Sequence, residues 1–409
     1  MLSHIIYALL ASLAIISNVS AAPSHSRSKT KWTNNSPKAV YLITNDQQNA
    51  VAALPIAADG TLSAGTITLT GGAGSNAIDG ATDQPATPDA LIGQSALTIA
   101  GQHIFAVNPG SNTLSMFAID ASNSTKLTLL GQPVDLPGDF PNTVAASVKH
   151  KTVCVGTTGA TNGVSCSSFS RSGLSAMDGL RSFNLNQTTP PVGPTNTVSQ
   201  LFFSEDESRL FATVKGDPTV NNTGFFSVFP VDTSSWGKPA TVATTDVRSS
   251  PDGTAVLFGS ANIPGASLVF VTDASFGGAV LDVDPATNVA SLVAKQAIDG
   301  QAATCWATIS SVTNSAFVTD VGVNRVVEMS LTNASIIAET DLSANGDPGL
   351  IDLKAAGNFI YALSPGNGTT PAAITVLDVS GGQGSAKSIQ HLTLTSMGVD
   401  KNAQGMAVV

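Results

Sequence analysis

The sequence predicts an all-β fold, a seven-bladed β-propeller whose ring is closed by the C-terminal strand. Three observations support this prediction: a repeated pair of apolar runs, the spacing of its copies, and an apolar segment left over at the end of the chain. The pattern is clearest in residues 104–120, where two apolar runs flank the turn residues 109–112. Apolar runs on either side of such a turn are typical of a β-hairpin.

The hairpin pattern occurs seven times. The copies begin near residues 40, 104, 152, 210, 268, 316 and 360. Their spacing of roughly 44 to 63 residues lies in and just above the range for propeller blades of four strands. The first run of each copy is apolar on both alternating faces, so we expect it to be the second strand of a blade, covered on both sides by neighbouring blades.

A short apolar segment precedes copies two to seven and is predicted to be the innermost strand of each blade. These segments span residues 95–100, 143–148, 199–204, 255–260, 305–310 and 349–354; the fourth could instead be an outer strand of the preceding blade. The first copy lacks such a segment, whereas residues 405–409 are apolar with no hairpin after them. The last strand is therefore predicted to complete the first blade, which leaves only short sheet edges.

Residues 1–21 are predicted to be a secretory signal peptide. The apolar run at residues 5–16 is too short to span a bilayer comfortably, and small residues precede the expected cleavage site. A retained membrane anchor is the alternative. Residues 22–37 are expected to be a disordered lead-in and residues 38–409 a single propeller domain. The mature chain is therefore predicted to be secreted, either to the extracellular space or to a cell wall.

Composition agrees with an extracellular protein. Charged residues make up 11% of the chain, against about 25% in typical globular proteins, so Ser, Thr, Asn and Gly must form much of the surface. The net charge of −10 argues against nucleic acid and anionic membranes as partners. Six N-x-S/T sequons are predicted glycosylation sites: Asn34, Asn123, Asn186, Asn221, Asn333 and Asn367.

The three cysteines have different expected roles. Cys154 and Cys166 lie on the two arms of the third hairpin, which predicts a cross-strand disulfide in an oxidising compartment. Cys305 is left over in an apolar stretch and is expected to be a buried, inert thiol, with a nucleophile as the alternative. There is no Cys/His cluster with metal-ligand spacing and no phosphate-binding loop, so neither a metal nor a cofactor is predicted.

The hairpins resemble those of the lactonase-type seven-bladed propellers. The residues that carry the resemblance are VYLITN and NAVAALPI in the first copy, IFAVN and NTLSMFAI in the second, and the SPDG turn at 250–253. This family includes 6-phosphogluconolactonase-like and 3-carboxymuconate-cyclase-like proteins, and the sequence looks like its secreted fungal glycoprotein branch. The resemblance covers the mature chain. It implies a site in the central funnel, where Arg holds a carboxylated substrate and His or Glu moves the proton that opens or closes a lactone.

The family's catalytic motif is only partly present. Its enzymes carry a Pro-His pair on an inner strand, followed by a D-L-G-x-D-[RK] turn. Residues 320–325 match this turn as DVGVNR, with Asn324 in place of the second acid. The preceding inner strand begins ATCW at residues 303–306 and has no histidine, and the mature histidines, at positions 25, 103, 150 and 391, are not placed for the funnel.

Polar residues on the predicted inner strands and hairpin turns are the candidates for a funnel site. Cations hold carboxylates in place and carboxylates move protons, so Asp320, Arg325, Lys215 and Asp217 are predicted catalytic groups. A local salt bridge or a turn hydrogen bond is the alternative role for each. The predicted substrate-binding residues are Arg325, Trp306, Gln200 and Asn142, with core packing as the alternative for Trp306. Asp273 and Gln404 are further candidates for the funnel wall.

Two functions remain open. The first is a lactonase-like or cyclase-like enzyme acting on a small carboxylated compound of the muconate or lactone class. The second is a non-catalytic secreted or cell-wall glycoprotein that uses the propeller as a binding or antigenic scaffold, because sites are grafted independently onto common folds. The expected partner is accordingly a small carboxylated molecule or a cell-wall glycan, and the protein is expected to be a monomer.

Overall fold

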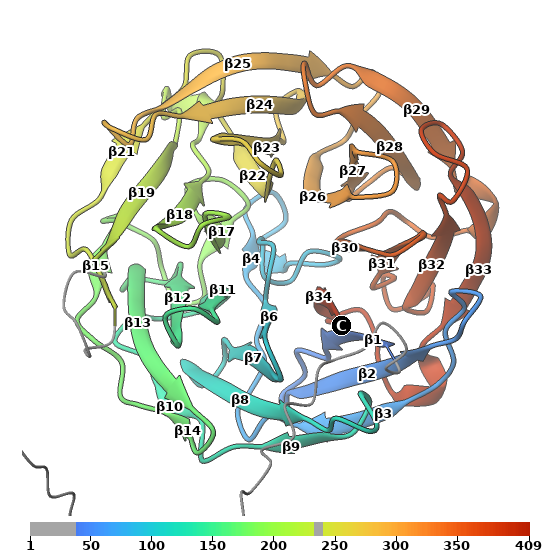
Figure 1. Ribbon diagram of the computed structural model, residues 1–409, viewed down its shortest axis with the longest axis horizontal. Coiled ribbons are helices and arrows are strands. Elements are labelled where there is room, and N and C mark those ends of the chain that lie inside the picture. The colour runs from blue at the N-terminus through green and yellow to red at the C-terminus, as the bar shows by residue number, and fades with distance from the viewer. Residues whose placement is uncertain (1–37, 233–239) are drawn as a thin grey trace, which may run out of the picture. The chain divides into compact units, whose positions relative to one another are not determined.

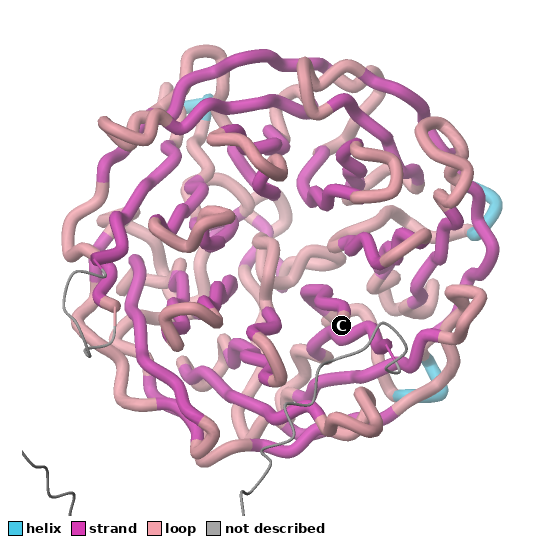
Figure 2. Tube along the Cα trace, in the orientation of Figure 1, coloured by secondary structure: helices cyan, strands magenta, loops and turns pink. Residues whose placement is uncertain are grey.

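Strands dominate the computed structural model, which describes residues 38–232 and 240–409 (Figure 1). The predicted signal peptide and lead-in, and Asn34, lie outside these residues. In the described ranges, seven antiparallel sheets of four or five strands surround a common centre, and a three-stranded sheet lies nearer the axis. The only helices there are three single 3-10 turns, which Figure 2 shows at the periphery: η1 (Pro218–Val220), η2 (Ser343–Asn345) and η3 (Thr395–Met397).

The first three sheets contain residues from both ends of the described chain. The first sheet consists of β34 (Gln404–Val408), β1 (Lys38–Ile43), β2 (Ala50–Ile56) and β3 (Thr66–Leu69). The second consists of β6 (Leu97–Ala100), β7 (His103–Asn108), β8 (Thr113–Ile119), β9 (Leu127–Leu129) and β10 (Val134–Asp135). The third consists of β11 (Pro141–Ser147), β12 (Thr152–Thr157), β13 (Gly163–Ser170), β14 (Gly173–Leu174) and β15 (Arg181–Ser182).

The next four sheets follow in chain order. The fourth consists of β17 (Val198–Phe203), β18 (Arg209–Val214), β19 (Phe225–Asp232), β20 (Thr241–Val242) and β21 (Val247–Ser249). The fifth consists of β22 (Leu257–Asn262), β23 (Leu268–Asp273), β24 (Gly277–Val283) and β25 (Ala290–Ala297). The sixth consists of β26 (Thr304–Ser310), β27 (Ser315–Asp320), β28 (Arg325–Ser330) and β29 (Ile336–Asp341). The seventh consists of β30 (Leu353–Ala356), β31 (Phe359–Ser364), β32 (Ala373–Asp378) and β33 (Lys387–Thr393).

The predicted closure of the ring is confirmed. β34 pairs with β1, with Val408 opposite Val40 and Ala407 opposite Tyr41, so the last strand supplies the inner strand of the first sheet. The segment at 255–260, whose assignment was open, is largely β22, the inner strand of the fifth sheet. One inner strand begins later than predicted: β30 starts at Leu353, inside the predicted segment 349–354, although the N–H of Ile351 still donates to Leu363 O of β31.

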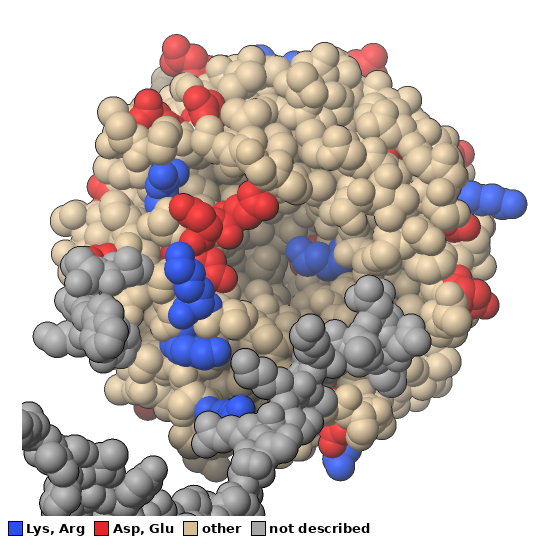
Figure 3. Space-filling view, viewed as in Figure 1, with Lys and Arg blue, Asp and Glu red and all other residues tan. Residues whose placement is uncertain are grey.

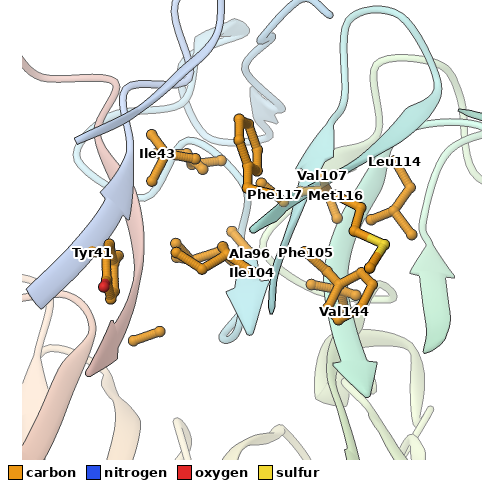
Figure 4. Packing of buried hydrophobic residues seen from close by; sticks show 14 of the residues in the cluster. Tyr41, Ile43, Ala96, Ile104, Phe105, Val107, Leu114, Met116, Phe117 and Val144 are labelled. Atoms are coloured by element: carbon orange, nitrogen blue, oxygen red, sulfur yellow. The ribbon is translucent and has the colours of Figure 1, made fainter. Parts of the chain in front are cut away.

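The second strand of each sheet is covered on both faces, as the sequence predicted. β12, for example, is buried at every residue. Figure 4 shows how the first two sheets pack, with Tyr41 and Ile43 facing Ile104 and Phe117, while Phe105 on the other face of β7 packs toward the third sheet. Burying a large apolar side chain of this kind stabilises the fold by about 1.5–3 kcal/mol. Packing between neighbouring sheets is therefore a major source of stability for the ring.

Two predicted covalent features can be located. Cys154 and Cys166 lie opposite each other on β12 and β13 and form the predicted disulfide. The five sequon asparagines within the described ranges are all exposed, so each is accessible to glycosylation: Asn123, Asn186, Asn221, Asn333 and Asn367.

Removal of residues 404–409 is expected to lower the melting temperature by several degrees or to abolish cooperative unfolding. The deletion exposes the edge of β1 and removes Met406, which is fully buried; deletion of a buried Met side chain alone costs about 2–5 kcal/mol. Differential scanning calorimetry measures the effect. Leu69→Ser, on the exposed outer strand of the same sheet, is the control and should stay close to the unmodified protein. Equal melting temperatures for the truncated and full-length proteins would contradict the structural role of this closure.

Candidate functional site

The connection between the first two sheets enters the centre of the ring (Figure 1). It forms β4 (Ile78–Asp79) and β5 (Gln84–Pro85), and β4 pairs in parallel with β16 (Val192–Gly193). Residues 86–96, here called the axial segment, then run to β6. Ala90, Leu91 and Gln94 in this segment are fully buried, so chain rather than open space occupies this part of the axis.

The axial segment is bound by several sheets at once. Its backbone oxygens at positions 88, 91, 92 and 93 accept hydrogen bonds from Gln404, Asn142, Lys215 and Trp306. Three of these donors lie on inner strands of the first, third and sixth sheets, and Lys215 directly follows β18 of the fourth sheet. The Gln94 side chain bonds both the N–H and the C=O of Ala307, at 3.1 and 2.9 Å. A buried backbone group needs such a partner, because leaving it unpaired costs about 1–3 kcal/mol.

Close packing around this segment requires glycine at two places. A Cβ at Gly93 would lie 2.8 Å from the backbone oxygen of Ser199, and one at Gly259 would lie 2.5 Å from that of Cys305. Both distances are shorter than van der Waals contact, so a larger residue at Gly93 would displace the axial segment from the fourth sheet, and one at Gly259 would push the fifth and sixth sheets apart.

A cavity of about 370 Å³ lies beside the axial segment. The fourth, fifth and sixth sheets and the three-stranded sheet contribute to its wall. Most of the lining is apolar, and its charged groups are Asp79, Asp89 and Lys215. In the face drawn in Figure 3, the ring is hollowed near its centre and charged groups occupy a minor part of the surface. The remaining lining residues are Ala86, Thr87, Pro88, Ile92, Gly193, Pro194, Val256, Phe258, Ala274, Ala303, Cys305, Val321 and Gly322.

Lys215 is the cation of this cavity. Its Nζ donates to Ile92 O at 2.6 Å and to Ser199 Oγ at 3.0 Å, and lies 4.4 Å from the centroid of the Phe258 ring. Burial lowers the pKa of Lys215, and the nearby Asp89 carboxylate partly opposes that shift. An ammonium group has three donors, and two of them are used by the protein.

The pKa of Asp89 is shifted in the opposite direction to that of Lys215. Burial raises the pKa of Asp89 to about 7, against the lowering effect of Lys215. Its Oδ1 is buried and has no hydrogen-bond partner in the described part of the chain. A carboxyl group of raised pKa beside a lysine of lowered pKa, in a mainly apolar cavity, is the arrangement expected of an acid–base site.

Cys305 also lies on the cavity wall. It is unpaired and buried, as the sequence predicted. Burial raises the pKa of its thiol well above the usual value, with the Asp89 carboxylate as the next cause. Because the thiolate is the reactive form, this environment disfavours a nucleophilic role.

The predicted substrate-binding residues of the inner strands hold the axial segment instead of lining the cavity. Asn142 donates to Leu91 O and Val198 O, while Gln200 donates to Ser95 Oγ of the axial segment and also bonds the backbone of Ser260. Trp306 is fully buried, packs edge-to-face on Phe258 and donates to Gly93 O. These side chains therefore lie behind the wall that a ligand would touch.

The predicted catalytic residues, Lys215 apart, are not brought to the cavity. Asp320 accepts backbone N–H groups from both flanking turns, among them those of Ala302 and Gly322. Arg325 pairs with Glu339 at 2.9 Å and donates to Asp299 O, because the start of β28 faces the outer strand β29. Asp217 caps η1. Asp320 and Arg325 thus serve separate local contacts.

The described histidines are also engaged away from the cavity. His103 packs against Phe169, His150 contacts Glu207 O, and His391 bonds Asp347 at 3.0 Å; His25 lies outside the described residues. Within those residues, no group of three His, Cys, Asp or Glu side chains is arranged to hold a metal ion. No helix there has the length and apolar character needed to cross a membrane.

Asp89 was missed by the sequence analysis. It lies between the first and second hairpin copies, in the longest interval between any two copies. That surplus length was the available signal, since a four-stranded blade does not require it. Asp89 precedes the apolar run 90–93, but the sequence around it has no strand or turn pattern that would have placed it at the axis.

Comparison with solved structures identifies the fold. The periplasmic gluconolactonase PpgL of Pseudomonas aeruginosa is similar over 91% of this chain and 98% of its own, with a TM-score of 0.65 and 13% identity. The architecture is that of the propeller lactonases. A proposed 6-phosphogluconolactonase of Bacteroides fragilis is similar over 92% of this chain and 99% of its own (TM-score 0.59, 11% identity). Another, from Bacteroides uniformis, matches over 70% and 80% (TM-score 0.52, 14% identity). The sequence matches no protein-family model and no curated protein.

Gln94→Leu is expected to lower the free energy of unfolding by about 2–4 kcal/mol, because both backbone groups of Ala307 lose their buried partner. Urea denaturation measures this change. Gln390→Leu is the matched control: Gln390 makes the same two-bond contact with Leu62, at 2.7 and 2.8 Å, but on a half-buried outer strand. A loss for Gln94→Leu no larger than the control's would show that the axial segment does not depend on this contact.

Proposed function

We propose that this protein is a secreted lactone hydrolase whose reaction takes place in the axial cavity. The single observation that carries the proposal is that Asp89 and Lys215 line the same mainly apolar cavity. A catalytic base works best when its pKa lies near the operating pH, and burial raises the pKa of Asp89 to about 7. The likeness of the fold to propeller lactonases supports the reaction class.

The two side chains fit the steps of lactone hydrolysis. Asp89 accepts a proton from a water molecule as the water oxygen attacks the lactone carbonyl carbon. The third N–H of Lys215, which finds no acceptor among the described residues, stabilises the negative charge that develops on the carbonyl oxygen. The bond between the carbonyl carbon and the ring oxygen then breaks, and the proton held by Asp89 passes to the ring oxygen. One water and one lactone give one hydroxy acid.

The cavity wall favours an uncharged lactone over a carboxylated or phosphorylated one. Its charged groups are two carboxylates, Asp79 and Asp89, and one ammonium, Lys215. An anionic substituent would add a third negative charge in a poorly solvated space, which is unfavourable without a further cation. Of the ligand classes that the resemblance implies, an uncharged lactone therefore fits better than a muconate.

Secretion is part of the proposal. Its support is the predicted signal peptide, the exposed sequons, and the Cys154–Cys166 disulfide, which persists in oxidising compartments.

A non-catalytic scaffold is the second candidate. The observation in its favour is that the described histidines and Arg325 are all held in contacts away from the cavity. Under this alternative, the axial cavity binds a lactone-like molecule without turnover or binds none.

Asp89→Asn is expected to lower kcat for hydrolysis of an uncharged lactone, such as gluconolactone, by about 10²–10⁴-fold, as for loss of a general base. Lys215→Met should also lower it. Stopped-flow absorbance with a pH indicator measures hydrolysis against the uncatalysed rate. Lys295→Met, which removes an exposed ammonium on an outer strand, controls for net charge and should retain activity. Turnover by the Asp89→Asn protein equal to that of the unmodified protein would exclude Asp89 as the base.

The Asp89 ionisation also predicts a pH dependence with a defined sign. As the base, Asp89 must be deprotonated, so kcat/KM is expected to rise as pH increases through about 7. The free energy of unfolding should change in the opposite direction, because the folded state binds the Asp89 proton more tightly than the unfolded state does. The contribution of Asp89 to stability therefore falls as the pH rises from about 4 to about 7, which are roughly the pKa values of Asp89 in the unfolded and folded states. Chemical denaturation across that range, compared with Asp89→Asn, should show the slope in the unmodified protein alone. An identical slope in both proteins would assign it to other groups.

A further inference from the structure

A second hollow lies away from the axial cavity, between the hairpin loop of the fourth sheet and the chain that joins β15 to β16. Its volume is about 430 Å³, within the range of about 300–1,000 Å³ for pockets that bind small molecules. We call it the sequon cleft, because one sequon asparagine lines it and a second lies between two of its lining residues. Those residues are Phe183, Asn184, Leu185, Asn186, Asn196, Asp217, Val220, Asn222 and Phe225.

One wall of the sequon cleft is apolar and consists of two aromatic rings and an exposed valine. Phe183 and Phe225 pack edge-to-face with centroids 5.4 Å apart, and the Arg248 guanidinium lies 4.6 Å from the centroid of Phe225. Val220 is 69% exposed, the most of the exposed large hydrophobic side chains among the described residues. An aromatic ring edged by polar groups is a suitable surface for the C–H face of a sugar.

The two sequon asparagines at the cleft differ from the other three described ones in their side-chain hydrogen bonds. The side-chain oxygens of Asn123, Asn333 and Asn367 accept backbone N–H groups within their own turns. Asn186 and Asn221 make no side-chain hydrogen bond with the described residues. Their side chains are therefore free to turn with an attached sugar, and Asn186 itself lines the cleft.

The polar wall has unused hydrogen-bonding capacity. Asp217 uses Oδ1 to cap η1 through Thr219, and its Oδ2 has no partner among the described residues. Asn184 uses its Oδ1 with Ser182 and leaves its amide donors free within the same residues. Sugar hydroxyl groups both donate and accept, so they match a carboxylate oxygen and an amide N–H together.

We infer that the N-linked glycan on Asn186 packs its first N-acetylglucosamine into the sequon cleft, against Phe225 and Val220. The contact has a consequence for the chain that follows. Gln187 bonds the backbone of Val192 and Asn196, so residues 187–196 form a compact loop. Gly193 and Pro194 of that loop line the axial cavity. A sugar held in the cleft would fix one end of the loop.

Enzymatic deglycosylation of the secreted, full-length protein tests the inference. Intact mass spectrometry reports occupancy, and calorimetry reports the melting temperature before and after treatment with an endoglycosidase that leaves one sugar and with an amidase that leaves none. Removal of the last sugar is expected to lower the melting temperature by about 2 °C or more. Asn186→Asp, which is the amidase product at that site, should lack this decrease. Asn367→Asp, at a sequon remote in sequence, should keep it.

Two further variants test the packing contact. Phe225→Leu and Val220→Ser should each reduce the decrease caused by removing the last sugar to less than half, because the sugar and the side chain then no longer stabilise each other. Val220 is exposed, so its variant is expected to fold even if the Phe225 variant does not. The inference is overturned if Asn186 carries no glycan, if Asn221→Asp rather than Asn186→Asp removes the effect, or if both packing variants keep the full decrease. None of these outcomes depends on lactone hydrolysis.

Discussion

The central constraint of this structure is that a polypeptide backbone occupies part of the axis. Backbone N–H and C=O groups cannot be buried without partners, so the sheets around the axial segment must supply them. Asn142, Lys215, Trp306 and Gln404 do so from four different sheets. Without the axial segment, these polar side chains would line an open funnel and indicate a ligand-binding site. The inner strands thus recognise the protein's own chain.

The same constraint accounts for the charges of the cavity. Lys215 reaches a backbone oxygen of the axial segment, and Asp89 is carried by that segment, so the folding of one connection brings both groups to a site with little water. Burial then shifts their pKa values toward each other. A buried oxygen with no partner among the described residues, such as Asp89 Oδ1, is a feature that native proteins retain at functional sites. The structural role and the proposed chemical role of Lys215 are therefore compatible, since its third donor is left over.

The sequence was sufficient to predict the ring of sheets, but not the axial segment and the cavity at its centre. The hairpin copies, the inner strands and the closure by residues 405–409, observed as β34 (Gln404–Val408), follow from local apolar patterns. The Cys154–Cys166 pairing followed from their places on one hairpin. The axial segment occurs once and has no periodicity, so Asp89 could not be placed. Arg325 was placed at the axis because its turn matched a family motif, yet its direction depends on Glu339, a partner on another strand. Of the proposed site, only Lys215 was named in advance.

The pairing of β1 with β34 also determines how the molecule would respond to tension. In the antiparallel pair, Val40 lies opposite Val408, so the two ends of the described chain leave the sheet from the same side. A force applied through these ends would load the hydrogen bonds one after another, as in the opening of a zipper, instead of all together as in shear. A propeller tethered at both ends would therefore open first at its closing strand.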